Sequence, residues 1–136
     1  MKAVLDTNVL VAAFVSDGLC RRLLLRARDR GFMLAITPFI RDEFAGALSR
    51  KAGAAAGEIR EALELIEEIS TSVDTTAGET GFTGICRDPD DDSVLACAVA
   101  IGANYLVSGD KDLLVLDNCR GVKIIAPRTF ELLFKD

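Results

Sequence analysis

Short apolar runs alternate with amphipathic stretches along the chain, and both patterns predict regular structure. The apolar runs predict buried strands at residues 2–5, 32–37, 104–108 and 122–126, with a further short candidate at 70–73. Helices are predicted at residues 7–14, 19–30, 38–51, 58–69, 91–101 and 127–134, with a single helical turn at 111–116 and a loop at 75–84. This alternation predicts an α/β fold, a three-layer α/β/α sandwich with a central parallel sheet of about five strands. We expect residues 1–136 to form a single domain.

Capping residues indicate where one helix begins and where two others end. Thr37 followed by Pro38 is typical of a helix start, because Thr caps the first turn and Pro is tolerated within it. Gly31 and Gly102 are typical of helix ends.

The composition agrees with a sheet covered by helices. Half of the residues are hydrophobic, but only 6% are aromatic and Trp is absent, so the core must be aliphatic. The N-terminal apolar run is interrupted by Asp6, where the core of a signal peptide would continue. No apolar run approaches the roughly 18 residues needed to span a membrane. We therefore expect a protein that stays in the cytoplasm and does not enter the membrane.

The missing and scattered residue types exclude several chemistries. The chain has no His, which excludes a Ser-His-Asp triad and any histidine base. The four cysteines are widely spaced and make no C-x-x-C pair, which argues strongly against a Cys/His zinc site. Cys97 lies in an apolar stretch and is expected to be a small core residue.

Acidic residues from separate segments are expected to meet at one edge of the predicted sheet. Asp6 ends the first strand and Asp110 follows the strand at 104–108. Asp91 and Asp92 open the helix before that strand, and Glu43 lies early in the helix after the second strand. In open parallel sheets, ligands bind at the carboxyl ends of the strands, where the strand order reverses. These four segments therefore predict a cluster of carboxylates at that edge.

Clustered carboxylates need a cation or protons to offset their repulsion. Two unit charges about 4 Å apart cost about 4 kcal/mol at an effective dielectric of 20. Oxygen ligands without His or Cys favour Mg²⁺ or Mn²⁺, which can lower the pKa of a bound water and stabilise the leaving oxygen of a phosphodiester. Each acid also has an ordinary structural explanation. Asp6 could cap the helix that follows it, and Glu43 could be a solvated helix residue. The acids at 88–92 could stabilise a helix start, and Asp110 and Asp112 could cap a short turn.

Four blocks of sequence resemble the PIN domain family. Residues 4–10, with Asp6-Thr7-Asn8 after an apolar strand, are similar to the opening of PIN domains. Residues 38–44 resemble the segment that carries the family's second acid, residues 87–98 its third acidic block, and residues 105–114 the block that follows. The order and spacing match over nearly the whole chain. It is most similar to the prokaryotic branch of toxins from toxin–antitoxin pairs, related to the VapC-type toxins.

The resemblance implies a metal-dependent endoribonuclease and assigns roles to individual residues. Asp6, Glu43 and Asp110 match the family acids, and the remaining acid falls on Asp91 or Asp92, depending on the alignment. The resemblance also implies supporting roles for three residues. Asn8 would tie the first loop to the acids through its amide, and Ser108 would order water or phosphate. Asp112 would be an outer acid. The resemblance also implies a homodimer and a cognate antitoxin that places a basic side chain in the acidic pocket.

The net charge of −5 disfavours general nucleic-acid binding, so RNA must be reached through a local feature. The candidate phosphate contacts are three arginines at i, i+4 and i+8 of one predicted helix, Arg22, Arg26 and Arg30. The alternative is that this spacing reflects an ordinary solvated helix face. Three other readings stay open: a phosphatase or phosphotransfer receiver domain, a non-catalytic PIN-like nucleic-acid or protein binding module, and a structural α/β domain whose acids lie far apart.

Overall fold

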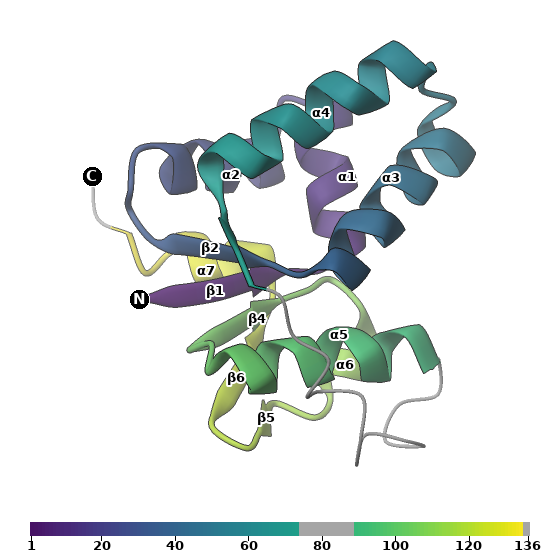
Figure 1. Cartoon of the computed structure of the whole chain (residues 1–136). Helices are drawn as coiled ribbons and strands as arrows, with labels where there is room; N and C mark the ends of the chain where they lie inside the picture. The colour runs from purple at the N-terminus through teal and green to yellow at the C-terminus, as the bar shows by residue number, and fades with distance from the viewer. Residues whose placement is uncertain (74–88, 135–136) are drawn as a thin grey trace.

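The computed structural model describes residues 1–73 and 89–134, and for residues 89–91 it describes the backbone alone. Within these ranges six strands form one sheet in the order β3-β2-β1-β4-β6-β5 (Figure 1). The strands are β1 (Lys2–Leu5), β2 (Met33–Ile36), β3 (Thr71–Ser72), β4 (Tyr105–Val107), β5 (Asn118–Cys119) and β6 (Val122–Ile125). The helices are α1 (Thr7–Val15), α2 (Leu19–Arg28), α3 (Pro38–Ala52), α4 (Ala56–Ile69), α5 (Pro89–Ile101), α6 (Lys111–Leu114) and α7 (Pro127–Glu131). The loop predicted at 75–84 lies outside the described residues.

The strand order reverses at the centre of the sheet, between β1 and β4. From β1 the chain first builds one side of the sheet through β2 and β3, and then returns to build the other side through β4 and β6. Both neighbours of β1 are parallel to it, with Leu5 opposite Val107 in the pairing with β4. The residues that follow these two strands therefore stand at the switch point, the place where parallel α/β sheets bind ligands.

The sheet is larger than the five parallel strands that the sequence predicts. β5 is the addition, a two-residue edge strand that pairs antiparallel with β6. It is held in a tight hairpin by the left-handed backbone of Arg120 and Gly121, whose φ angles are 50° and 91°. A strand this short carries no hydrophobic alternation, so the sequence pattern did not predict it.

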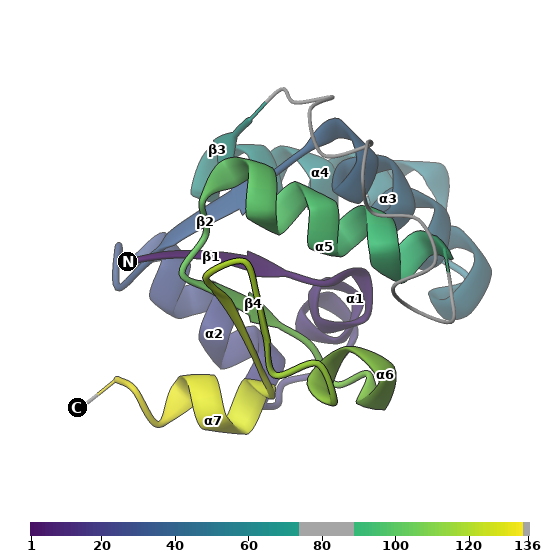
Figure 2. The ribbon, with the colours of Figure 1, turned by 90° about the horizontal axis from the view of Figure 1, so that it is seen from below.

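Helices cover both faces of the sheet. Figure 2 shows α1, α2 and α7 on one side of β1, with α5 on the other. The third helix, α3, packs against both α1 and α5, and α4 packs against α3. In the same view the amino ends of α1, α5 and α6 lie toward one end of the strands. This end is the carboxyl edge of the parallel strands.

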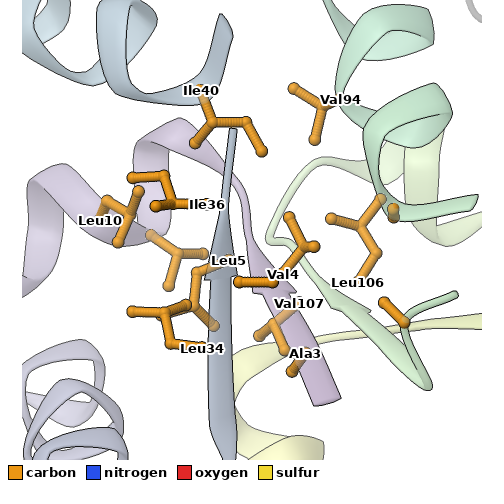
Figure 3. Close-up of a cluster of buried hydrophobic side chains, with 14 of the residues drawn as sticks. Ala3, Val4, Leu5, Leu10, Leu34, Ile36, Ile40, Val94, Leu106 and Val107 are labelled. Carbon is orange, nitrogen blue, oxygen red and sulfur yellow. The ribbon is translucent and has the colours of Figure 1, made fainter. Parts of the chain in front are cut away.

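The core is aliphatic around the central strands. Figure 3 shows side chains of β1, β2 and β4 packed together with residues of the flanking helices, among them Leu10, Ile40 and Val94. Cys97 is buried in this core as predicted. The same core includes a group of rings between α7 and the sheet, contributed by Phe32, Tyr105, Phe130 and Phe134.

Most helix boundaries agree with the sequence patterns, but α7 ends at Glu131 and α2 ends at Arg28, before their predicted ends at residues 134 and 30. The end of α2 has a clear structural cause. The N–H of Gly31 donates to the carbonyl of Arg26, and the N–H of Arg30 donates to that of Ala27. These two bonds form a Schellman ending in which Arg30 takes the left-handed position, with φ 65°.

No helix in the described part of the chain is long and apolar enough to cross a membrane.

Candidate active site

Asp6 sits at the switch point and has two structural roles. Its backbone N–H continues the β1–β4 ladder by donating to the carbonyl of Val107 at 3.0 Å. Its side chain caps α1, because Oδ1 accepts the N–H of Val9 at 3.0 Å. The side chain is only 6% exposed, an unusual position for a carboxylate. A helix cap alone does not require such burial.

Ser108 connects Asp6 to Asp110. The hydroxyl of Ser108, fully buried at the end of β4, donates to Oδ2 of Asp6. The Oγ of Ser108 in turn accepts the backbone N–H of Asp110 at 3.0 Å. Asp110 caps α6, and its Oδ1 accepts the N–H of Asp112 at 2.8 Å. The Ser108 hydroxyl therefore links the carboxylate of Asp6, in the loop after β1, to the backbone of Asp110, in the loop after β4.

The electrostatic setting of Asp6 disfavours its ionised form. Burial raises the pKa of the Asp6 carboxyl above its ordinary value, and the nearby negative charge of Asp110 raises it further. Hydrogen bonds from Ser108 and from the backbone N–H groups of Val9 and Asn8 oppose this rise without cancelling it. Since an opposite charge would favour the ionised form, this is a position suited to a cation.

The other two acids stand on helices that begin at the same edge of the sheet. Glu43 lies in the second turn of α3 and is partly buried, while Asp92 lies in the first turn of α5 and is 5% exposed. The side chain of Asp91 lies outside the described residues, as do Asp88 and the side chain of Asp90. Among the side chains that are described, no three acids or cysteines stand close enough together to share a metal ion.

The sequence of this site matches a known family. The PIN domain family matches residues 2–112, a range that includes Asp6, Glu43, Asp91, Asp92 and Asp110. The chain belongs to the PIN domain family.

A solved structure shows a similar fold. The crystal structure of VapBC2 from Rickettsia felis bound to a DNA fragment from their promoter contains a chain that superposes with a TM-score of 0.68. The match covers 93% of this chain and 98% of the other, at 19% sequence identity. At this identity the likeness concerns the fold alone. A comparison with curated proteins finds no match.

Two hydroxyl-bearing residues near the PIN acids were not singled out from the sequence as parts of the site. Thr37, at the end of β2, caps α3 through the N–H of Ile40 and also contacts Sγ of Cys97 in α5 at 3.2 Å. Thr7 directly follows Asp6, and its buried Oγ1 has no hydrogen-bond partner in the described part of the chain. Both residues occupy turn and cap positions, where Thr is common. The sequence alone therefore does not distinguish them from ordinary capping residues.

Cys20 is a further neighbour of Asp6. Burial raises the pKa of the Cys20 thiol, and the negative charge of Asp6 adds to the rise. The start of α2 therefore lies close enough to β1 for the two groups to interact. Nothing in the local sequence of Cys20 indicates this proximity.

Asn8 contacts both Asp6 and α3. Its backbone N–H interacts with the Asp6 carboxylate. Its side-chain oxygen accepts a hydrogen bond from Nζ of Lys51, at the end of α3, at 2.6 Å. The Asn8 side chain therefore contacts a cation, whereas the backbone N–H of Asn8 contacts the Asp6 carboxylate.

The three arginines predicted to contact RNA do not form one stripe. Arg26 is held by Glu131 of α7, with its Nε 2.9 Å from both carboxylate oxygens, and it lies 5.0 Å from the ring centroid of Phe134. Arg30 lies beyond the end of α2, in the left-handed turn. Of the three, only Arg22 is an exposed residue of α2. The predicted stripe is interrupted because α2 ends before Arg30 and because Arg26 takes part in the packing between α2 and α7.

Proposed function

We propose that this PIN domain is a metal-dependent endoribonuclease that hydrolyses RNA phosphodiester bonds, and that it is the toxin of a toxin–antitoxin pair. The observation that carries the proposal is the arrangement of Asp6, Ser108 and Asp110 at the β1–β4 switch point. It combines two carboxylates with the position where a parallel sheet binds its ligand. In this proposal residues 1–136 act as one nuclease domain.

The donor set fits a hard divalent cation. Asp6 and Asp110 offer carboxylate oxygens next to a hydroxyl, and His is absent from the whole chain. Such ligands suit Mg²⁺ or Mn²⁺. Asp6 and Asp110 would hold the ion, together with Asp92 or Asp91, and Glu43 would hold a second ion or orient the attacking water. When bound, the ion would lower the pKa of a water molecule and stabilise the charge on the leaving oxygen.

The remaining groups keep the acids in place. Ser108 fixes the orientation of the Asp6 carboxylate and at the same time ties down the backbone of Asp110. The N–H of Asp112 holds the other side of this network through Oδ1 of Asp110. Because these contacts use buried or backbone groups, the acids are held before substrate arrives, which is the condition for efficient catalysis by positioning.

Asp6 favours a catalytic site over a module that only binds a partner. A carboxylate that is buried next to another acid lowers the stability of the fold at neutral pH unless a cation offsets it. A binding module has no need to hold such a group. The receiver-domain alternative needs a pair of acids on the first loop, and Asp6 is followed there by Thr7 and Asn8.

The assembly and location of the protein follow from the same proposal. A toxin of this type acts on RNA in the cytoplasm, forms a homodimer and is inhibited by a cognate antitoxin. The fold similarity to a chain of the VapBC2 structure supports this context. A short reading frame next to the gene that encodes a DNA-binding N-terminus would support the antitoxin.

The function can be tested on purified protein with a pool of structured and single-stranded RNA. Cleavage in Mg²⁺ or Mn²⁺ that stops in EDTA is the expected result. A folded protein that binds these ions but cuts no RNA in the pool would instead favour the binding-module function.

A further inference from the structure

The guanidinium of Arg50 lies against a glycine. Ion pairs with carboxylates are made by four other arginines of the described chain, Arg21, Arg26, Arg28 and Arg41. Arg50 makes no ion pair among the described residues. A Cβ atom added to Gly46 would stand 2.7 Å from Nη1 of Arg50 and 3.6 Å from its Cζ. The guanidinium thus occupies the space that a side chain at position 46 would fill.

Gly46 has no evident backbone reason to be glycine. It lies in the interior of α3, a 15-residue helix, and its φ angle is not positive. Glycine at such a position destabilises a helix by about 1 kcal/mol relative to alanine. Among the described residues, the Arg50 guanidinium is the group that a side chain at position 46 would displace.

The position of the Arg50 guanidinium brings it toward the acids. Long side chains on a helix point back toward its N-terminus, and Arg50 follows this rule by lying over Gly46. Gly46 is three residues after Glu43, about 4.5 Å along the helix axis. Residues three apart are neighbours on a helix surface. The guanidinium therefore lies over the turn of α3 that follows Glu43.

Lys51 places a second cation beside the same site. Its Nζ donates to Oδ1 of Asn8 at 2.6 Å, and the backbone N–H of Asn8 contacts the Asp6 carboxylate. Lys51 is exposed and, like Arg50, makes no ion pair in the described part of the structure. The C-terminal part of α3 thus places one cation over Gly46, in the turn after Glu43, and a second against Asn8, next to the loop that carries Asp6.

We propose that Arg50 and Lys51 bind the phosphates of the substrate RNA next to the one that is cut, a role that rests on the proposed nuclease function. The chain has a net charge of −5 and concentrates acids at the site, so RNA is repelled there except where a cation intervenes. The fork of an arginine and the ammonium of a lysine are the groups that proteins use to bind phosphate. These two residues then replace the predicted α2 arginines as the contacts that bring RNA to the acids.

The test measures binding and cleavage separately. Binding of a labelled single-stranded RNA is measured by fluorescence anisotropy with Mg²⁺ in the Asp6→Asn background, over salt from about 50 to 200 mM. Arg50→Gln, Lys51→Gln and Gly46→Ala are compared with two controls. Lys123→Gln makes the same charge change on β6 near the amino end of the strands, and Gly57→Ala makes the same exchange in α4, where an added Cβ meets nothing within 4 Å.

Each of the three variants is expected to weaken binding about two- to fivefold, the effect of one exposed ion pair. The slope of log affinity against log salt should fall by about 0.7 for each lost contact. In the otherwise wild-type enzyme these variants should raise KM more than they lower kcat. Gly46→Ala is the most specific variant, since it should raise thermal stability and still weaken binding.

Two results overturn the proposal in distinguishable ways. If the wild-type protein cleaves RNA but the three variants bind with wild-type affinity and salt slope, Arg50 and Lys51 are not phosphate contacts. If the wild-type protein neither binds nor cleaves RNA, the nuclease function fails and this role fails with it. An equal loss in Lys123→Gln would show that net charge, not position, is what matters.

Discussion

Ser108 donates its hydroxyl proton to Oδ2 of Asp6, so that a buried side-chain hydrogen bond joins the residues that follow β4 and β1. These are the two strands between which the order of the sheet reverses. The bond orients a carboxylate that burial and a neighbouring acid would otherwise leave poorly stabilised. The account of this PIN domain as a nuclease depends on that relationship.

Ser108→Ala should destabilise the protein by about 1–3 kcal/mol, because it leaves a buried carboxylate oxygen without its donor. It should also shift the acidic limb of the pH–rate profile to higher pH, since the Ser108 hydrogen bond lowers the pKa of Asp6. Urea unfolding and pH-dependent cleavage measure the two effects. Ser49→Ala, at an exposed position of α3, is the control and should change neither. An unchanged acidic limb would mean that Asp6 does not titrate in the rate-determining process.

Asp6→Asn should become more stable relative to wild type as the pH rises, provided that metal ions are removed. The folded state raises the pKa of Asp6, so it holds the proton more tightly than the unfolded chain does. Wild-type stability is therefore lost as the pH rises from about 3.9, the ordinary aspartate value, through the raised pKa. Thermal unfolding of both proteins in EDTA across this range gives the difference. A difference that does not vary with pH would contradict the burial of the charge.

Added Mg²⁺ or Mn²⁺ should reverse this order. An ion that binds the folded state alone stabilises it in proportion to the logarithm of its concentration. Wild type should therefore gain thermal stability as the ion is titrated, and Asp6→Asn should gain less. Equal gains in the two proteins would place the bound ion away from Asp6.

Arg26→Met should cost about 2 kcal/mol of stability, the scale of hydrogen bonds to a charged group, and leave RNA affinity unchanged. The reason is that Arg26 is bound to Glu131 and stacked on Phe134, where it joins α2 to α7. Arg22→Met, on the exposed side of the same helix, should change stability by no more than about 0.5 kcal/mol. Denaturant titration and anisotropy binding distinguish these roles. If Arg26→Met kept full stability but lost RNA affinity, the predicted RNA contact by the α2 arginines would be supported instead.

Much of the fold could be predicted because the sequence marks it locally. The pair Thr37-Pro38 predicted the start of α3, and the structure shows Thr37 as its cap. The apolar run that stops at Asp6 predicted β1. In both cases hydrophobic pattern and cap chemistry act over a few neighbouring residues, which is the range that a single sequence reveals.

The remainder depends on contacts between distant segments. Nothing near Arg26 indicates that Glu131, 105 residues away, holds it. The sequence left open whether Asp6 is a helix cap or a site residue, and the structure shows that it caps α1 with one oxygen and faces Ser108 with the other. Gly46 was visible as a glycine within a helix, but its relation to Arg50 required coordinates.

The most direct test of the nuclease site compares RNA cleavage by wild type, Asp6→Asn and Asp17→Asn in Mg²⁺, in Mn²⁺ and in EDTA. Asp17 is exposed and pairs with Arg21 at the start of α2, so its substitution is a matched control. The account predicts metal-dependent cleavage by wild type and by Asp17→Asn, and none by a folded Asp6→Asn. Cleavage at the wild-type rate by pure Asp6→Asn would contradict it.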